Sequence, residues 1–197
     1  MKNFIPVFLF LLALPAFSMT NYKIDPSHSE VGFKVKHLVV STVPGKFKEF
    51  EGNFKFDEKT GKVEDVQFKI KAASIDTNEP KRDEHLRSKD FFEVDKYPTI
   101  EFKSTKVETS GKKPTRVHGD LTMHGVTKNV ALKLKYNGTI KDPWGNQKLG
   151  FEANTKLNRE DFNLKWNKAL ETGGVVVGKE VEIIILGEAT AEAEKAK

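Results

Sequence analysis

The side chains that could perform acid–base or metal chemistry in this chain are five histidines, one of which, His85, lies close in sequence to Asp83, Asp90 and Glu93. A histidine beside carboxylic acids is a combination that general acid–base catalysis uses. Near a short helix, however, such acids are more often helix caps and surface ion pairs. We therefore predict that this cluster is structural and that the chain has no catalytic residue.

The other histidines give no better support for a reactive or metal-binding site. His118 and His124 share a strand parity opposite to the apolar positions and are predicted to face solvent. His37 shares the parity of an apolar strand face, and His28 lies in a turn. No two histidines are four residues apart, as on a zinc-binding helix, and the chain has no cysteine. Motifs for nucleophilic serine, phosphate loops and dinucleotides are also absent. We predict no enzyme activity, no metal and no cofactor.

Around His85 the sequence changes from strand-like alternation to a short polar helix. Pro80 suits a first helical turn, where its missing N–H is not needed. Two adjacent aromatics, Phe91 and Phe92, follow the helix and lead towards the next strand. This pattern predicts a helix around residues 80–90 that closes one end of a barrel, anchored by the two phenylalanines. A second short helix is predicted at 163–170.

Most of the remaining chain alternates apolar and polar residues with the period of two that is typical of β-strands. Eight such segments contain residues 31–35, 54–56, 66–70, 100–102, 117–123, 130–136, 149–153 and 181–185. Lysine dominates their polar faces, which indicates that these faces meet water. A single flat sheet would leave its apolar face bare, so the sheet must close or pair. The pattern predicts an all-β fold, an eight-stranded antiparallel barrel with one or two short helices.

The lysines and aromatic residues are interleaved, which raises the question of nucleic-acid binding. A single-stranded nucleic acid needs both residue types on one exposed face. Phe33 and Lys34 are neighbours, as are Phe68 and Lys69, so each pair points to opposite faces of a strand. This arrangement predicts no nucleic-acid partner. The charged exterior also excludes an outer-membrane barrel, whose outer face is apolar.

The first eighteen residues have the composition of a secretory signal. Lys2 precedes a nearly wholly apolar run, and Ala16 and Ser18 provide small residues before a predicted cleavage at Met19. Residues 19–190 are predicted to form one domain, and 191–197 a frayed charged tail. No later stretch is long enough to cross a bilayer. Because an exported chain without cysteine cannot form disulfides, we predict a periplasmic location.

The predicted interior is rich in aromatic residues, since the chain has fifteen phenylalanines. The inward parity of five strands is shared by Phe33, Phe68, Phe102, Leu134 and Phe151. Such residues form either a packed core or the lining of a cavity that holds one ligand, and barrels of eight strands allow both. The residue pattern leaves these two alternatives open.

Several short motifs, in this order and spacing, resemble the YceI-like family of polyisoprenoid-binding proteins over about residues 22–189. The motifs are Asp25-Pro26-Ser27-His28-Ser29, Val31-x-Phe33-x-Val35-x-His37, Gly45-x-Phe47, Gly52, Ser74-Ile75-x-Thr77, Arg82-Asp83, His85-Leu86, Asp90-Phe91-Phe92, Tyr97-Pro98, Phe102-x-Ser104, Gly119-x-Leu121, Gly125-x-Thr127-Lys128 and Arg159-x-Asp161-Phe162. Two positions depart from the family pattern: Glu93 stands where Asp is usual, and Asn163 where Gly is common.

The resemblance implies a lipocalin-like barrel whose deep apolar cavity holds the tail of a polyisoprenoid or an isoprenoid quinone, for transport or storage in the periplasm. The expected ligand-binding residues are Phe33, Val35, Phe68, Phe91, Phe92, Phe102, Leu121, Leu134, Phe151 and Ile183. The candidates for contact with a polar head group are Arg82, Arg87 and Arg159. Alternatives are an enzyme acting on a lipid or quinone-like substrate in the same cavity, and a stress-related structural or interaction protein with a solid core. A homodimer remains an option.

Overall fold

In the computed structural model the described residues are 19–169 and 174–192, and most of them lie in β-strands. The strands are β1 (Thr20–Ile24), β2 (Glu30–His37), β3 (Ser41–Phe47), β4 (Phe50–Asp57), β5 (Lys62–Lys71), β6 (Ile75–Asp76), β7 (Thr99–Ser110), β8 (Lys113–Met123), β9 (Val126–Lys141), β10 (Gln147–Asn158) and β11 (Val177–Ala191). One α-helix is described, α1 (Pro80–Arg87), with short 3-10 helices η1 (Pro26–His28), η2 (Ala72–Ser74) and η3 (Arg159–Phe162).

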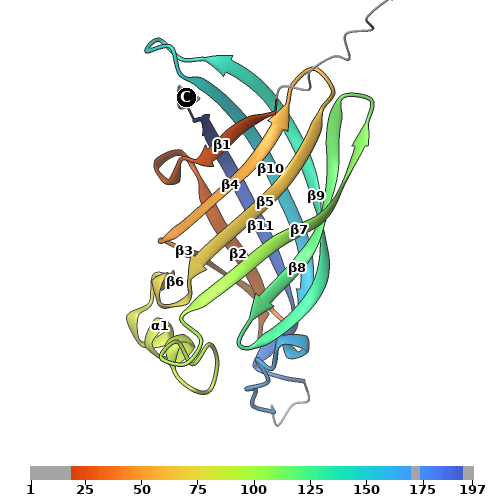
Figure 1. The fold of residues 1–197 in the computed structure, drawn as a ribbon. Coiled ribbons are helices and arrows are strands. Elements are labelled where there is room, and N and C mark those ends of the chain that lie inside the picture. The colour runs from red at the N-terminus through yellow and green to blue at the C-terminus, as the bar shows by residue number, and fades with distance from the viewer. Residues whose placement is uncertain (1–18, 170–173, 193–197) are drawn as a thin grey trace, which may run out of the picture.

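The strands form a closed antiparallel barrel (Figure 1). Closure occurs at β1, which pairs with β4 on one side and with the end of β11 on the other, Tyr22 opposite Ala191. The ring therefore runs β1-β4-β5-β7-β8-β9-β10-β11 and back to β1. The predicted eight-stranded antiparallel barrel is confirmed, with three further strands, β2, β3 and β6, that continue from β11.

The ring differs from the prediction in one member. The first predicted strand is β2, which pairs with β11 at Val31 and Ile185 and lies beside the part of β11 that β1 does not reach. The strand that closes the ring is the shorter β1, which precedes it. Between them, η1 bends the chain, and the Asp25 carboxylate caps this turn by accepting the Ser27 N–H at 3.0 Å.

Within the strands, outward residues are exposed, whereas many inward residues are only partly buried. In β5, Gln67, Lys69 and Lys71 are exposed, while Phe68 and Ile70 between them have intermediate exposure. An inward side chain in a filled barrel would be fully buried. The intermediate exposure of this inner row indicates that it borders empty space inside the barrel.

The segment around α1 closes one end of the barrel, at the lower end in Figure 1. Asp83 is buried and accepts hydrogen bonds from the Thr77 N–H and hydroxyl at 2.8 and 2.6 Å. Arg87 donates to the carbonyls of Ala73 and Ile75, each at 2.7 Å. These contacts fix the helix to the chain that leads into it. The predicted helix around residues 80–90 is thus confirmed, and it ends at Arg87.

The second predicted helix, at 163–170, is wrong for the described residues. The helical turn is η3, which precedes it, and residues 164–168 have no regular structure. Asn163 ends η3 with a φ of 61°, the left-handed conformation that Asn adopts more readily than most residues. Asn163, at the position where the resembled family commonly has Gly, thus adopts a conformation that Gly adopts easily, and Leu164 follows as a buried residue.

The ends of the chain lie largely outside the described residues. The predicted signal, residues 1–18, falls there, as do 193–197 of the predicted tail and Leu170 of the predicted second helix. Ala191 belongs to β11. Among residues 19–169 and 174–192, no helix is long and apolar enough to cross a membrane.

Candidate functional site

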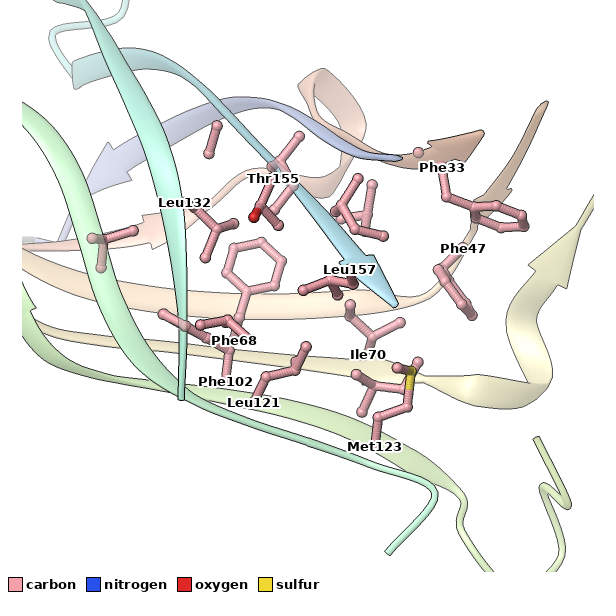
Figure 2. Close-up of a pocket in the computed structure, with 18 of the residues that line it drawn as sticks. Phe33, Phe47, Phe68, Ile70, Phe102, Leu121, Met123, Leu132, Thr155 and Leu157 are labelled. Carbon is pink, nitrogen blue, oxygen red and sulfur yellow. The ribbon is translucent and has the colours of Figure 1, made fainter. Parts of the chain in front are cut away.

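The barrel encloses an apolar cavity with a volume of about 240 Å³. Its lining comes from strands all around the ring and from the segment after α1, and Figure 2 shows part of it. Polar side chains among the lining residues are those of Tyr136, Thr155 and Arg159. The Thr155 hydroxyl donates to the Ala131 carbonyl at 2.9 Å. The interior consequently favours hydrocarbon over water, because an apolar cavity offers water too few partners.

Four lining phenylalanines lie directly over glycines of a neighbouring strand. A Cβ atom on Gly52 would lie 2.6 Å from the Cδ2 atom of Phe68, well inside van der Waals contact. The Phe68 ring therefore covers the backbone of β4 instead of projecting to the barrel axis. The same arrangement joins Phe33 to Gly45, Phe102 to Gly119, and Phe151 to Gly187. Rings held against the wall leave the centre of the barrel open.

All ten side chains that the sequence assigned to the ligand lie along this cavity. They are Phe33, Val35, Phe68, Phe91, Phe92, Phe102, Leu121, Leu134, Phe151 and Ile183. Phe91 and Phe92 extend the lining at the end closed by α1, and the ring of Phe92 meets that of Phe47 edge-on, with centroids 5.9 Å apart. Contact of these residues with a ligand stays a prediction.

Other lining residues were missed by the sequence reasoning. Phe47 lies in β3, where Pro44 and Gly45 obscure the strand pattern. Leu86 was named only as part of a family motif, and Leu157 lies beyond the predicted end of its strand. The alternation of β10 does continue as far as Leu157, so a longer strand assignment could have found it.

The three arginines differ in their relation to the cavity. Arg159 lines it, is buried, and donates from its guanidinium to the carbonyls of Gly178, Leu164 and Val177. Burial lowers the pKa of this guanidinium from its ordinary value. Arg87 holds the carbonyls before α1, as described above. Arg82 donates to the Thr77 hydroxyl and carbonyl at 2.7 and 2.9 Å. Neither Arg82 nor Arg87 is among the lining residues.

His85 lies beside the cavity end, outside its lining. Its Nε2 atom is 3.1 Å from an Asp90 carboxylate oxygen, and both side chains are well exposed. The imidazole meets the rings of Phe91 and Trp166 edge-on, at centroid distances of 5.1 and 4.8 Å. These contacts join the segment after α1 to the segment after η3, which is a structural role.

His124 contradicts its predicted position on the surface. Its side chain is only 13% exposed and packs edge-on against Tyr97, with ring centroids 4.6 Å apart. Both ring nitrogens are buried, and neither has a hydrogen-bond partner among the described residues. Strand parity fails here because His124 lies in the turn between β8 and β9 with a φ of 49°. His118 does lie on the outer wall, 2.8 Å from the Glu108 carboxylate.

The Asp25-Pro-Ser-His28 turn brings together a possible set of metal ligands with Glu188, whose donor atoms lie within 4.8 Å of one another. The Lys148 ammonium lies 3.2 Å from Asp25 and 3.1 Å from Glu188. Hydrogen bonds from Ser27 and His28 lower the pKa of Asp25, and Glu188 raises that of Lys148. The Lys148 ammonium thus neutralises these carboxylates and links the η1 turn to β10 and β11.

Comparison with known proteins identifies relatives over most of the chain. A UPF0312 protein of Photorhabdus laumondii is 49% identical over 147 residues, which cover 74% of this chain and 76% of that protein. The crystal structure of the Campylobacter jejuni YCEI protein superposes with a TM-score of 0.70 at 33% identity, covering 86% of this chain and 96% of that one.

A more distant neighbour shares the fold. It is a polyisoprenoid binding domain from Saccharophagus degradans, implicated in plant cell wall breakdown, with a TM-score of 0.62 and 15% identity, covering 87% of this chain and 98% of that one. The YceI-like domain profile matches residues 22–189, from within the closing strand β1 to Ala189 near the end of β11. On this match and on its curated relatives, the chain belongs to the YceI-like family.

Proposed function

We propose that this protein is an exported lipid-binding protein that holds the tail of a polyisoprenoid or an isoprenoid quinone inside its barrel, for transport or storage in the periplasm. The observation that carries the proposal is the apolar cavity, whose lining extends from the closed end at Phe91 and Phe92 to Tyr136 near the other end. Membership of the YceI-like family and the fold shared with a polyisoprenoid binding domain support the choice of ligand.

The energetics of tail burial are sufficient for useful affinity. Each five-carbon isoprene unit removed from water gains roughly 4 kcal/mol gross, at about 0.8 kcal/mol for each carbon. A micromolar dissociation constant requires only about 8 kcal/mol net. Several buried units therefore exceed this requirement after the costs of association and ordering. Methyl branches stiffen the tail, which lowers the cost of ordering compared with a straight chain.

For the polar head group, Arg159 is the arginine we retain as a candidate within the cavity. No carboxylate lies within 4.0 Å of its guanidinium among the described residues, and its hydrogen-bond partners there are neutral carbonyls. Its positive charge therefore suits an anionic or carbonyl-bearing head group near η3. Arg82 and Arg87, bound to the chain around β6 and η2, are candidates only for a head group that lies outside the cavity.

The direct test is the identity of the lipid that copurifies with the protein from a periplasmic extract. Mass spectrometry of the extracted lipid should find an isoprenoid, and delipidated protein should bind a fluorescent isoprenoid with saturation. A straight-chain fatty acid of equal carbon number serves as the control competitor and should displace the probe less well. The absence of saturable isoprenoid binding by the delipidated wild type would contradict the proposal.

A second candidate function is catalysis on a lipid or quinone-like substrate in the same cavity. The observation that favours it is the His85–Asp90 pair, which adjoins Phe91 of the lining. A histidine held by a carboxylate can act as a base. The pair is exposed and shares its ring contacts with Trp166, so we rank this function below binding.

A further inference from the structure

The turn between β2 and β3 exposes three apolar side chains to solvent. Leu38, Val39 and Val40, which we call the basal tip, are 37%, 69% and 86% exposed. Leu38 and Val39 also have positive φ values of 51° and 65°. Successive residues in this conformation are typical of type I′ turns, which strongly favour Asn and Gly, and a β-branched residue is strained there. The residues at this turn are therefore poorly explained by the needs of folding.

The basal tip adjoins one end of the cavity. The Leu38 N–H donates to the Val176 carbonyl at 2.9 Å, and His37 pairs with Val177 across β2 and β11. Val35 and Val177 line the cavity. The cavity lining therefore reaches the ends of β2 and β11, next to the exposed tip.

The surroundings of the basal tip are basic. Lys36 precedes it on β2, and Lys165 and Lys168 lie on the neighbouring segment, where the Val176 N–H donates to the Lys168 carbonyl at 3.1 Å. All three lysines are exposed, and within the described residues none has a carboxylate within 4.0 Å of its ammonium. Elsewhere on the barrel many lysines are paired, as in Lys156 with Glu180.

The other exposed apolar turn has mixed charge, because the exposed Lys141 lies next to Asp142. Trp144 is 84% exposed between β9 and β10, and Ile140 is 72% exposed. The turn is built on Asp142, whose carboxylate accepts the N–H groups of Trp144 and Asn146 at 2.9 and 2.8 Å. With one exposed lysine and an acid at its base, this turn complements an anionic surface less well than the basal tip with its three lysines, so it serves as the control.

We propose that the basal tip docks the barrel on a bilayer surface that contains anionic phospholipid. The three apolar side chains of the basal tip enter the apolar boundary of the bilayer, and the three lysines meet the phosphate groups. The inference rests on the proposed function, because docking would bring the end of the cavity beside α1 and η3 to the bilayer. An isoprenoid tail that passes between these segments would then have a shorter path through water.

The test measures flotation of the mature protein with vesicles that contain no isoprenoid. One set contains phosphatidylglycerol and phosphatidylcholine in equal parts, and the other phosphatidylcholine alone. The wild type should bind the anionic vesicles, with affinity that falls as salt is raised. The double variant Leu38→Asn/Val39→Gly should lose about tenfold or more in affinity, since two apolar side chains leave the interface. Trp144→Ser should bind as the wild type does.

The double variant is designed to keep its fold, because Asn and Gly adopt positive φ more readily than Leu and Val. Its melting temperature should equal or exceed that of the wild type, and it should bind a fluorescent isoprenoid unchanged in the absence of vesicles. If the wild type binds no isoprenoid, the proposed function is wrong. Vesicle binding can still be measured in that case, so the docking proposal is tested separately.

Three outcomes would overturn the docking proposal. The first is the absence of wild-type binding to anionic vesicles. The second is equal vesicle binding by the wild type and the Leu38→Asn/Val39→Gly variant, or a loss confined to Trp144→Ser. The third is a change from dimer to monomer in that double variant, measured by light scattering, without any change in vesicle binding, which would assign the tip to a second copy of the chain.

Discussion

Replacing Phe68 by alanine distinguishes a hollow barrel from a solid one. One face of the Phe68 ring covers Gly52, and the ring stacks on Phe50 with centroids 6.0 Å apart, while the rest borders the cavity. A fully buried Phe→Ala change costs about 3–5 kcal/mol in unfolding free energy. Because part of this ring has no protein neighbour, we expect a loss of only about 1.5–2.5 kcal/mol in Phe68→Ala.

The same substitution should weaken ligand binding. A phenylalanine buries about 150–250 Å² when enclosed, and we take roughly a third of that area as the part facing the cavity. At about 25 cal/mol per Å², the lost contact amounts to about 1.3–2 kcal/mol, or roughly a tenfold to thirtyfold rise in the isoprenoid dissociation constant. Phe151→Ala, whose ring covers Gly187, should behave in the same way.

Phe162 is the matched control, because it is 2% exposed and is not among the lining residues. Phe162→Ala should cost about 3–5 kcal/mol and leave the affinity of the folded protein for isoprenoid unchanged. The assays are denaturant titration of delipidated protein and titration with a fluorescent isoprenoid. The reasoning is refuted if Phe68→Ala is as destabilising as Phe162→Ala while isoprenoid affinity does not fall.

Burial raises the pKa of Tyr22 to about 12, so the folded state favours the neutral phenol. As pH rises from about 10 to about 12, the unfolding free energy of the wild type should therefore fall more steeply than that of Tyr22→Phe, as measured by denaturant titration at each pH. The pKa of Asp25 is lowered, first by Ser27; its contribution is therefore present above about pH 4 and lost on acidification, and the difference in melting temperature between wild type and Asp25→Asn should narrow below that pH. His85→Ala should leave isoprenoid binding unchanged, whereas loss of lipid turnover at unchanged stability would favour the enzyme. The intact mass of the protein from a periplasmic extract should be that of a chain that begins at Met19. Full-length chain in the membrane fraction would contradict this prediction.

Strand periodicity was sufficient to predict the barrel, because inward and outward residues alternate cleanly in strands such as β5. It failed for β3, where Pro44 removes a ladder donor and Gly45 leaves room for the ring of Phe33. That use of glycine depends on a neighbouring strand and is invisible in the local sequence. Short strands such as β1 and β6 also escape, since two to five residues give too little alternation to count.

The lining of the cavity was predicted only in part, because strand alternation gives the direction of a side chain but not its neighbours on other strands. Parity identifies which residues point inward, but the free space between them depends on where rings such as Phe68 come to lie. The position of His124 could not be predicted, because its backbone leaves the strand conformation in the turn and turns the imidazole under Tyr97. The partners of Arg87 and Arg159 are backbone carbonyls from other segments, which no side-chain motif encodes.

The phenylalanine rings that cover glycines imply that the width of the cavity depends on residues that do not line it. Gly52 contributes nothing to the interior surface, yet a single methyl group there would force the Phe68 ring off the wall and towards the axis. A Gly→Ala substitution on an adjacent strand could thus change the width of the ligand that the barrel accepts, although every side chain that lines the cavity stays the same. Family members that share these phenylalanines but differ at the facing glycines would then select lipid tails of different width.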